Sequence, residues 1–284
     1  MHLINCYTRH LEEFFGEKIP AYAILSHAWG EGEVSYAEMK YDQTASRLKE
    51  GYRKIDFTCR QALLDGYQYA WVDTCSIDKS SSAELSEAVN SMFRWYEKSA
   101  VCYVYLSDVF RAGFDQEFPQ SRWFTRGWTL QELLAPKNVT FYDREWSRLG
   151  TKIEFANLLH DITKIDTLAL DPGPGEESAL RVLSTFCSAQ KMSWASHRQT
   201  TREEDVAYSL LGIFNIAMPL LYGEGTRAFQ RLQEEIIRQS GDDTILAWGL
   251  NSQDHRTHYP GTQHTTAPST AAVMLIIEAR IARK

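Results

Sequence analysis

Short runs of consecutive apolar residues alternate with longer, helix-like segments in the front half of this 284-residue chain. Strands that helices cover on both faces are apolar throughout, whereas half-exposed strands alternate apolar and polar residues. A regular exchange of such strands with helices is typical of a parallel sheet flanked by helices. We therefore predict an open, mainly parallel, flavodoxin-like α/β domain over residues 21–147, with strands at residues 22–26, 69–73, 101–106 and 139–143.

The segments between these runs have the marks of helices. Over residues 48–63 the apolar side chains recur with the spacing of one helix face. Ser81 or Ser82 can cap the next helix, because a serine hydroxyl accepts a hydrogen bond from a free backbone N–H of the first turn. A third helix is predicted over residues 128–135, since Pro136 cannot continue it.

Helix-like patterns dominate beyond residue 147. We predict a mainly helical extension over residues 148–250, with helices near 180–187, 206–216 and 228–239. The TTREED run at 200–205 places acidic residues where a helix N-terminus favours them. We predict a polar lead-in at 1–20 and a loose tail at 251–284, in which residues 271–277 are apolar enough for a strand or a short helix.

Charge and cysteine content exclude several classes of protein. The net charge of −7 argues against a general nucleic-acid binder, which usually has a basic face. The five cysteines form no CxxC pair, so neither a disulfide framework nor a cysteine zinc site is indicated. The first residues form no apolar run like that of a signal peptide, and the apolar stretches are too short to span a membrane. We expect a cytoplasmic protein that binds no membrane, metal or cofactor.

Four ordered segments carry a resemblance to a known family: YAILSHAWG (22–30), WVDTCSID (71–78), FRWYEKSAVCYVYLSDV (93–109) and WFTRGWTLQELLAP (123–136). With a fifth segment at 196–225, they make residues 20–250 resemble the heterokaryon incompatibility (HET) domains of fungi. The chain departs from the family pattern at Ala28, where threonine is common, and at Ser76, where a second cysteine is common. The resemblance implies a role in programmed cell death, self/non-self recognition and innate immunity.

HET domains are in turn similar to Toll/interleukin-receptor (TIR) domains. The segment GWTLQELL (127–134) resembles the tryptophan-x-x-x-glutamate helix of enzymatic TIR domains, whose glutamate acts in the cleavage of NAD. This likeness implies that Glu132 is catalytic, that Trp128 lies one turn before it, and that NAD is a substrate.

Such a reaction suits a single carboxylate. Nicotinamide leaves as a neutral ring, so it needs no general acid, whereas a usual glycosidase pairs two carboxyl groups. Glu132 would orient the ribose hydroxyls and stabilise the positive charge that develops on the sugar. Trp128 shares a helix face with Glu132 and could hold a cationic ring.

Polar side chains follow the first two predicted strands. Ligands of open α/β sheets bind beyond the carboxyl ends of the strands, where these side chains should gather. His27 is a second catalytic candidate, and the candidate substrate-binding residues are Ser26, Trp29, Asp73, Asp78 and Trp128.

Each of these residues has a structural alternative. Glu132 could complete a capping box with Thr129, or pair with Arg126. The tryptophans could be packing residues, and His27 could be a loop residue tied to the backbone. Asp73 and Asp78 could form turns and cap the following helix. A nucleophilic pair of His27 and Cys75 is disfavoured, because a buried cysteine usually behaves as a small apolar residue.

Two functions remain open at this level. The domain could cleave NAD or a related nucleotide, or it could be a non-enzymatic signalling module that forms a homo-oligomer or binds a partner death-signalling protein. The direction of the Glu132 side chain bears on the choice. A carboxyl group facing the rim beside His27 and Trp29 favours a site, and one folded back onto its own helix favours a cap.

Overall fold

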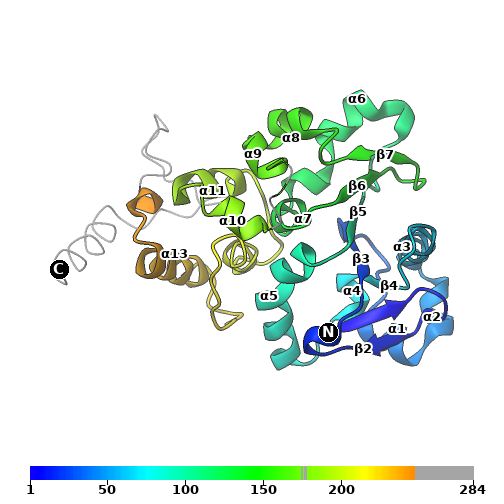
Figure 1. The fold of residues 1–284 in the computed structure, drawn as a ribbon. Coiled ribbons are helices and arrows are strands. Elements are labelled where there is room, and N and C mark those ends of the chain that lie inside the picture. The colour runs from blue at the N-terminus through cyan, green and yellow to red at the C-terminus, as the bar shows by residue number, and fades with distance from the viewer. Residues whose placement is uncertain (174, 176–177, 247–284) are drawn as a thin grey trace.

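The computed structural model describes residues 1–173, 175 and 178–246, so the predicted tail at 251–284, with its apolar stretch, lies outside the described residues. Within them, one mixed sheet is covered by helices on both faces, and a helical part lies beside it (Figure 1). The strands are β1 (His2–Asn5), β2 (Leu11–Glu13), β3 (Tyr22–His27), β4 (Tyr69–Trp71), β5 (Val101–Tyr105), β6 (Val139–Tyr142) and β7 (Arg148–Thr151).

The sheet has the order β2-β1-β4-β3-β5-β6-β7. Its four inner strands, β4, β3, β5 and β6, are parallel to one another, whereas β1, β2 and β7 pair in antiparallel fashion. The inner strands follow a flavodoxin-like order. The chain places β4 on one side of β3 and then crosses to the other side of β3 to add β5 and β6. The predicted α/β class, with a mainly parallel core, is confirmed.

The outer strands are not predicted by the apolar runs. β1 and β2 form a hairpin within the predicted lead-in, and β7 lies inside the predicted helical extension. All three are short, and β2 and β7 keep side chains in contact with water. A strand that is neither long nor fully covered has no continuous apolar run to reveal it.

The helices have the following bounds. The α-helices are α1 (Tyr36–Tyr41), α2 (Gln43–Leu48), α3 (Tyr52–Leu64), α4 (Asp73–Ser76), α5 (Ser82–Glu97), α6 (Phe114–Glu117), α7 (Thr129–Leu134), α8 (Ala156–Thr163), α9 (Thr167–Leu170), α10 (Ala179–Leu183), α11 (Ser188–Ala195), α12 (Asp205–Tyr208) and α13 (Arg227–Ser240). Short 3₁₀ turns lie at Gly16–Lys18, Arg111–Gly113, Phe118–Gln120, Arg122–Thr125 and Asp243–Leu246.

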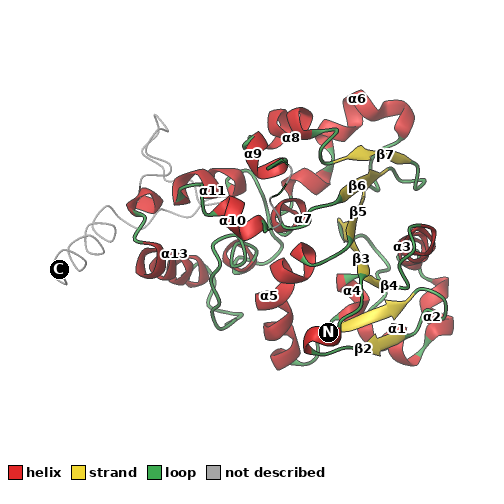
Figure 2. Ribbon diagram, in the orientation of Figure 1, coloured by secondary structure: helices red, strands yellow, loops and turns green. Residues whose placement is uncertain are grey.

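Alternate residues of the inner strands pack into two separate cores. On β3, Ala23 and Leu25 pack with α3 on one face, while Tyr22 and Ile24 pack with α5 and α7 on the other. The strands occupy the right half of Figure 2, and α10, α11 and α13 lie to the left of α5 and α7. Helix α7 thus lies between the sheet and the helical extension.

Two helix predictions need correction. The helix predicted over 48–63 begins at Tyr52, and Leu48 ends α2 with 85% of its surface exposed. The helix predicted over 206–216 is wrong beyond Tyr208, where the chain continues in turns. Gly212 lies there against the Phe93 ring, so close that a Cβ atom would overlap that ring. Tertiary packing of this segment therefore replaces a regular helix.

Two other helix predictions agree with the structure, and a third agrees in part. Ser81 caps α5 by accepting a hydrogen bond from the Glu84 N–H at 3.3 Å. α13 buries Phe229, Leu232 and Ile236 as one face. The helix predicted near 180–187 is shorter, because α10 ends at Leu183. No helix in the described part of the chain is long and apolar enough to cross a membrane.

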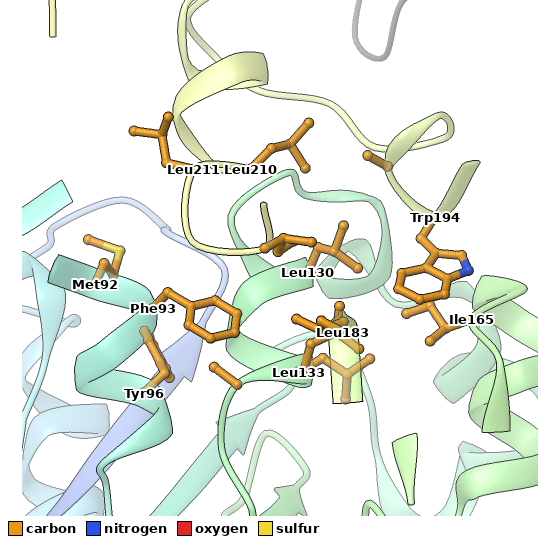
Figure 3. Close-up of a cluster of buried hydrophobic side chains, with 14 of the residues drawn as sticks. Met92, Phe93, Tyr96, Leu130, Leu133, Ile165, Leu183, Trp194, Leu210 and Leu211 are labelled. Atoms are coloured by element: carbon orange, nitrogen blue, oxygen red, sulfur yellow. The ribbon is translucent and has the colours of Figure 1, made fainter. Parts of the chain in front are cut away.

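Helix α7 is the centre of the larger core. All six of its residues are buried. Leu130 and Leu133 lie among side chains of α5 and of the helical extension, as Figure 3 shows with Met92, Phe93, Tyr96, Ile165, Leu183, Trp194, Leu210 and Leu211. A glutamate in such a helix loses its hydration unless protein groups or a ligand replace it.

Candidate functional site

A cavity of about 370 Å³ opens beyond the carboxyl ends of β3 and β4. One wall comes from the sheet and α7, and includes His27, Trp29, Asp73 and Glu132. The other wall comes from the helical extension, through residues 199–202, Asp205 and Tyr222. The position matches the general rule for ligands of open α/β sheets, and the volume lies in the range of ligand pockets.

Glu132 lies at the inner end of this cavity and is only 7% exposed. The Ser26 hydroxyl, near the end of β3, donates a hydrogen bond to Glu132 Oε2. Trp123 Nε1 donates in turn to Ser26 Oγ at 2.8 Å. This chain of hydrogen bonds holds the carboxyl group toward the sheet edge.

The capping-box alternative for Glu132 is wrong. No side chain caps the start of α7. The Thr129 hydroxyl donates instead to the carbonyl oxygens of Trp123 and Arg126, at 2.6 and 2.9 Å. Glu132 therefore turns away from its own helix start and toward Ser26, as a site residue would.

The surroundings of Glu132 change its titration. Burial, together with the nearby negative charge of Asp73, raises the pKa of Glu132 to about 8. The hydrogen bond from Ser26 and the positive charge of Arg126 act in the opposite direction. Without a ligand, most of the Glu132 side chains are therefore protonated at pH 7.

His27 ends β3 and lies beside the same cavity. Its Nε2 is 3.7 Å from Asp73 Oδ1 and 3.9 Å from Glu33 Oε1, beyond hydrogen-bonding distance. Burial and the charge of Lys54 lower the pKa of His27 to about 3, so the ring is neutral. Both ring nitrogens are buried without a hydrogen-bond partner among the described atoms. The alternative of a loop histidine tied to the backbone is therefore wrong.

Trp29 and Asp73 form the outer part of the sheet wall. Trp29 Nε1 donates to Asp73 Oδ2 at 2.6 Å, and Trp29 is 43% exposed, which does not suit a packing residue. Asp73 lies in the first turn of α4 without capping it, because the N-cap residue Val72 carries no capping side chain. Asp73 Oδ1 is buried and unpaired among the described residues.

Neither the candidate Asp78 nor the disfavoured nucleophile Cys75 lines the cavity. The Asp78 carboxylate accepts hydrogen bonds from the Ser80 N–H and hydroxyl, at 3.0 and 2.5 Å, so it follows the turn-forming alternative. Cys75 is fully buried, and burial raises the pKa of its thiol to about 12. A thiol that holds its proton so firmly cannot act as the nucleophile at neutral pH.

The second wall is the part of the site that the sequence pattern does not predict. Residue 126, before α7, forms a parallel bridge with residue 199 of the helical extension. Next to it Arg198 is buried, and its guanidinium donates to the Arg126 carbonyl oxygen at 2.9 Å and to Thr129 Oγ1 at 2.8 Å. Burial lowers the pKa of Arg198 to about 9. Trp128 lines the cavity between the two walls.

Helix α7 is held at its other end as well. Lys152 Nζ donates to the carbonyl oxygens of Leu133 and Pro136, at 3.2 and 2.6 Å, where the helix ends. A positive charge suits the C-terminal end of a helix. With Arg198 at the start and Lys152 at the end, two buried cations fix the helix that carries Glu132.

The chain matches known sequences in two ways. The family model described as "Heterokaryon incompatibility protein (HET)" matches residues 22–117, and a domain of unknown function (DUF8212) matches residues 227–278. The vegetative incompatibility protein HET-E-1 of Podospora anserina is 49% identical over 235 residues, which are 79% of this chain and 17% of that protein. The chain thus spans about one sixth of the length of this curated relative.

No solved structure matches the chain. The HET match begins at Tyr22, the first residue of β3, and includes the cavity residues His27, Trp29 and Asp73. The identity to a fungal incompatibility protein extends over a much longer stretch than this match. The chain is a fungal-type member of the heterokaryon incompatibility (HET) domain family.

Proposed function

We propose that this HET-domain chain acts in fungal heterokaryon incompatibility by cleaving the bond between nicotinamide and ribose in NAD. The observation that carries the proposal is the Glu132 carboxyl group at the inner end of a cavity of about 370 Å³ beyond the parallel strands. The name of the relative supports the biological setting. The tryptophan-x-x-x-glutamate likeness to TIR domains supports the chemistry.

The reaction needs one negative charge in the right place. When the bond from ribose C1′ to the ring nitrogen breaks, both electrons go to nicotinamide, which leaves neutral. Positive charge then develops on the ribose, and water adds to C1′ and releases a proton. The Glu132 carboxylate would stabilise that charge in a cavity from which much water is excluded.

The raised pKa of Glu132 fits a site that is completed by a cationic ligand. Burial and the negative charge of Asp73 together keep the Glu132 carboxyl group protonated near neutral pH. A nicotinamide cation next to Glu132 would favour the ionised carboxylate and displace its proton. Cleavage should therefore increase with pH until Glu132 is ionised in the free protein, near pH 8.

The corner formed by His27 and Asp73 suits the ribose hydroxyls. His27 Nε2 and Asp73 Oδ1 are 3.7 Å apart, and both are buried without a partner among the described residues. Buried polar atoms of proteins are almost always hydrogen-bonded. A ribose hydroxyl can donate to the carboxylate, while its neighbour accepts from, or donates to, the neutral imidazole.

The test is the release of nicotinamide from NAD by purified protein, with and without induced clustering. We expect Glu132→Gln and Glu132→Ala to lower the rate at least ~100-fold, because the charge that stabilises the transition state is removed. Glu154→Gln is the matched control, since that carboxylate is exposed and lies on the β7 side of the sheet.

The opposite result has a clear meaning. If clustered wild-type protein releases no nicotinamide, or if Glu132→Gln cleaves NAD as fast as the wild type, the enzymatic proposal is wrong. Self-association measured on the same samples would then support the non-enzymatic signalling module.

A further inference from the structure

The charged residues around the cavity are partnered unequally. The acidic groups all receive hydrogen bonds from within the chain: Asp73 from Trp29, Asp205 from Tyr222, and Glu132 from Ser26. The basic side chains that line the cavity, Lys79, Arg126 and Arg202, have no carboxylate within 4 Å in the described part of the chain. Each acidic group of the cavity thus has at least one hydrogen-bond donor, although Asp73 Oδ1 has no partner among the described residues, whereas none of the three basic groups forms an ion pair there.

The aromatic contacts of these cations keep them at the cavity. Lys79 Nζ lies 3.8 Å from the centre of the Trp29 ring, and the Arg202 guanidinium lies 4.6 Å from the centre of the Tyr222 ring. Such contacts orient a cation without neutralising it. Arg126 also lines the cavity, and its guanidinium has no hydrogen bond to any described residue.

We propose that Arg126 and Arg202, with Lys79, form an anion subsite that binds the diphosphate of a nucleotide, in the same cavity as Glu132, Asp73 and His27. Arginine binds phosphate oxygens with paired, charge-assisted hydrogen bonds, and several cations around one cavity suit a ligand with more than one negative charge. The inference rests on the proposed function, because the diphosphate is the part of the NAD substrate that lies away from the bond to be cleaved.

The subsite also divides the cavity by chemistry. Ribose hydroxyls and a cationic ring suit the wall with Glu132, and anions are repelled there by Asp73. The Arg202 side chain is exposed, so the diphosphate would lie toward the mouth of the cavity. A neutral nucleoside would use only the inner half and should bind more weakly.

The experiment is a titration of the wild-type chain with ADP-ribose, which carries the diphosphate but has no bond to nicotinamide. We expect ADP-ribose to bind at least tenfold more tightly than adenosine or ribose, inorganic pyrophosphate to compete with it, and added salt to weaken it. Arg126→Met and Arg202→Met should each weaken ADP-ribose about tenfold. Arg60→Met is the control, because Arg60 is an exposed arginine of α3 that pairs with Asp56.

The results separate this inference from the proposed reaction. ADP-ribose binding that depends on Arg126 and Arg202, without nicotinamide release from NAD, keeps the anion subsite and refutes the reaction. Cleavage of NAD with an unchanged KM in the folded Arg126→Met/Arg202→Met double variant keeps the reaction and refutes the subsite. Absence of ADP-ribose binding, or adenosine binding as tight as that of ADP-ribose, also overturns the inference.

Discussion

The two walls of the cavity differ in burial and in chemistry. The wall from the sheet and α7 presents Asp73 together with His27 and Glu132, and burial is the main cause of the pKa shifts of His27 and Glu132. The wall from the helical extension presents several exposed side chains, among them Arg202, beside the half-buried Asp205 and Tyr222. Rigid, dehydrated groups suit a reaction, whereas exposed cations suit the capture of a charged ligand. One cavity can combine both because α7 packs against both regions.

The strongest test of this comparison is whether the two regions fold as one unit. Leu130→Ala removes a fully buried side chain of α7 that touches both α5 and the helical extension. We expect a loss of about 3–4 kcal/mol in the free energy of unfolding, with one cooperative transition in urea. Leu168→Ala, at a half-exposed position, should change stability far less. Two separate transitions would show that the walls belong to independent units.

The dehydrated character of the sheet wall predicts a pH effect on stability. The pKa of Glu132 is about 8 in the folded chain and near 4.5 when unfolded, so the folded state retains the proton between these values. Wild-type stability should therefore fall as pH rises from 4.5 through 8, because the buried group must ionise. The Glu132→Gln variant has no carboxyl group to ionise. Its free energy of unfolding should therefore exceed that of the wild type by on the order of 3 kcal/mol at pH 9.

Thermal or urea unfolding at pH 5 and pH 9 measures this difference directly. Glu154→Gln, on the surface, is again the control and should follow the wild type. A stability difference between the wild type and Glu132→Gln that is the same at both pH values would show that Glu132 is not dehydrated as the structure indicates.

The contact between the walls predicts a smaller effect. Arg198→Met removes the hydrogen bonds to the Arg126 carbonyl oxygen and to Thr129 Oγ1. We expect a loss of about 2 kcal/mol, since Thr129 Oγ1 loses its donor and the Arg126 carbonyl oxygen loses one of its two. Arg198→Lys should recover only part of it, because an ammonium group cannot reproduce the planar geometry of the guanidinium. Equal stability of all three proteins in urea would contradict this role.

The smallest effect is expected at the exposed wall. Arg202→Met should change the free energy of unfolding by less than about 0.5 kcal/mol, as is usual for surface substitutions. Ligand affinity should change while stability does not, which is the reverse of the pattern expected for Arg198. A large loss of stability in Arg202→Met would mean that this wall is structural rather than a binding surface.

Several parts of the fold could be predicted from short-range signals. The runs that form β3 to β6 are apolar because helices cover the strands on both faces. Ser81 caps α5 through a hydrogen bond to Glu84, a residue only three positions further along the chain. The edge strand β2 and the turns after Tyr208 have no such signal. Their conformation depends on partners distant in the chain, such as β1 and Phe93.

The same limit applies to the site. The sequence identified Glu132, His27, Trp29 and Asp73 as candidates through a motif and through their positions after strands, and all four line one cavity. It identified Asp78 by the same reasoning, but a local turn with Ser80 holds that carboxylate elsewhere. It did not identify Arg202 or Tyr222, because nothing in the local pattern places the helical extension over the sheet edge.

By itself the sequence determined the strand and helix pattern of the front half and the kinship to HET domains, because apolar periodicity and motifs are local properties. Only the tertiary structure decided whether Glu132 caps its helix or faces a cavity, and which protonation state it holds. Its hydrogen-bond donor, Ser26, is 106 residues away, and its pKa depends on burial and on the charge of Asp73. Dehydration and charge act through space, so residues distant in the chain determine them.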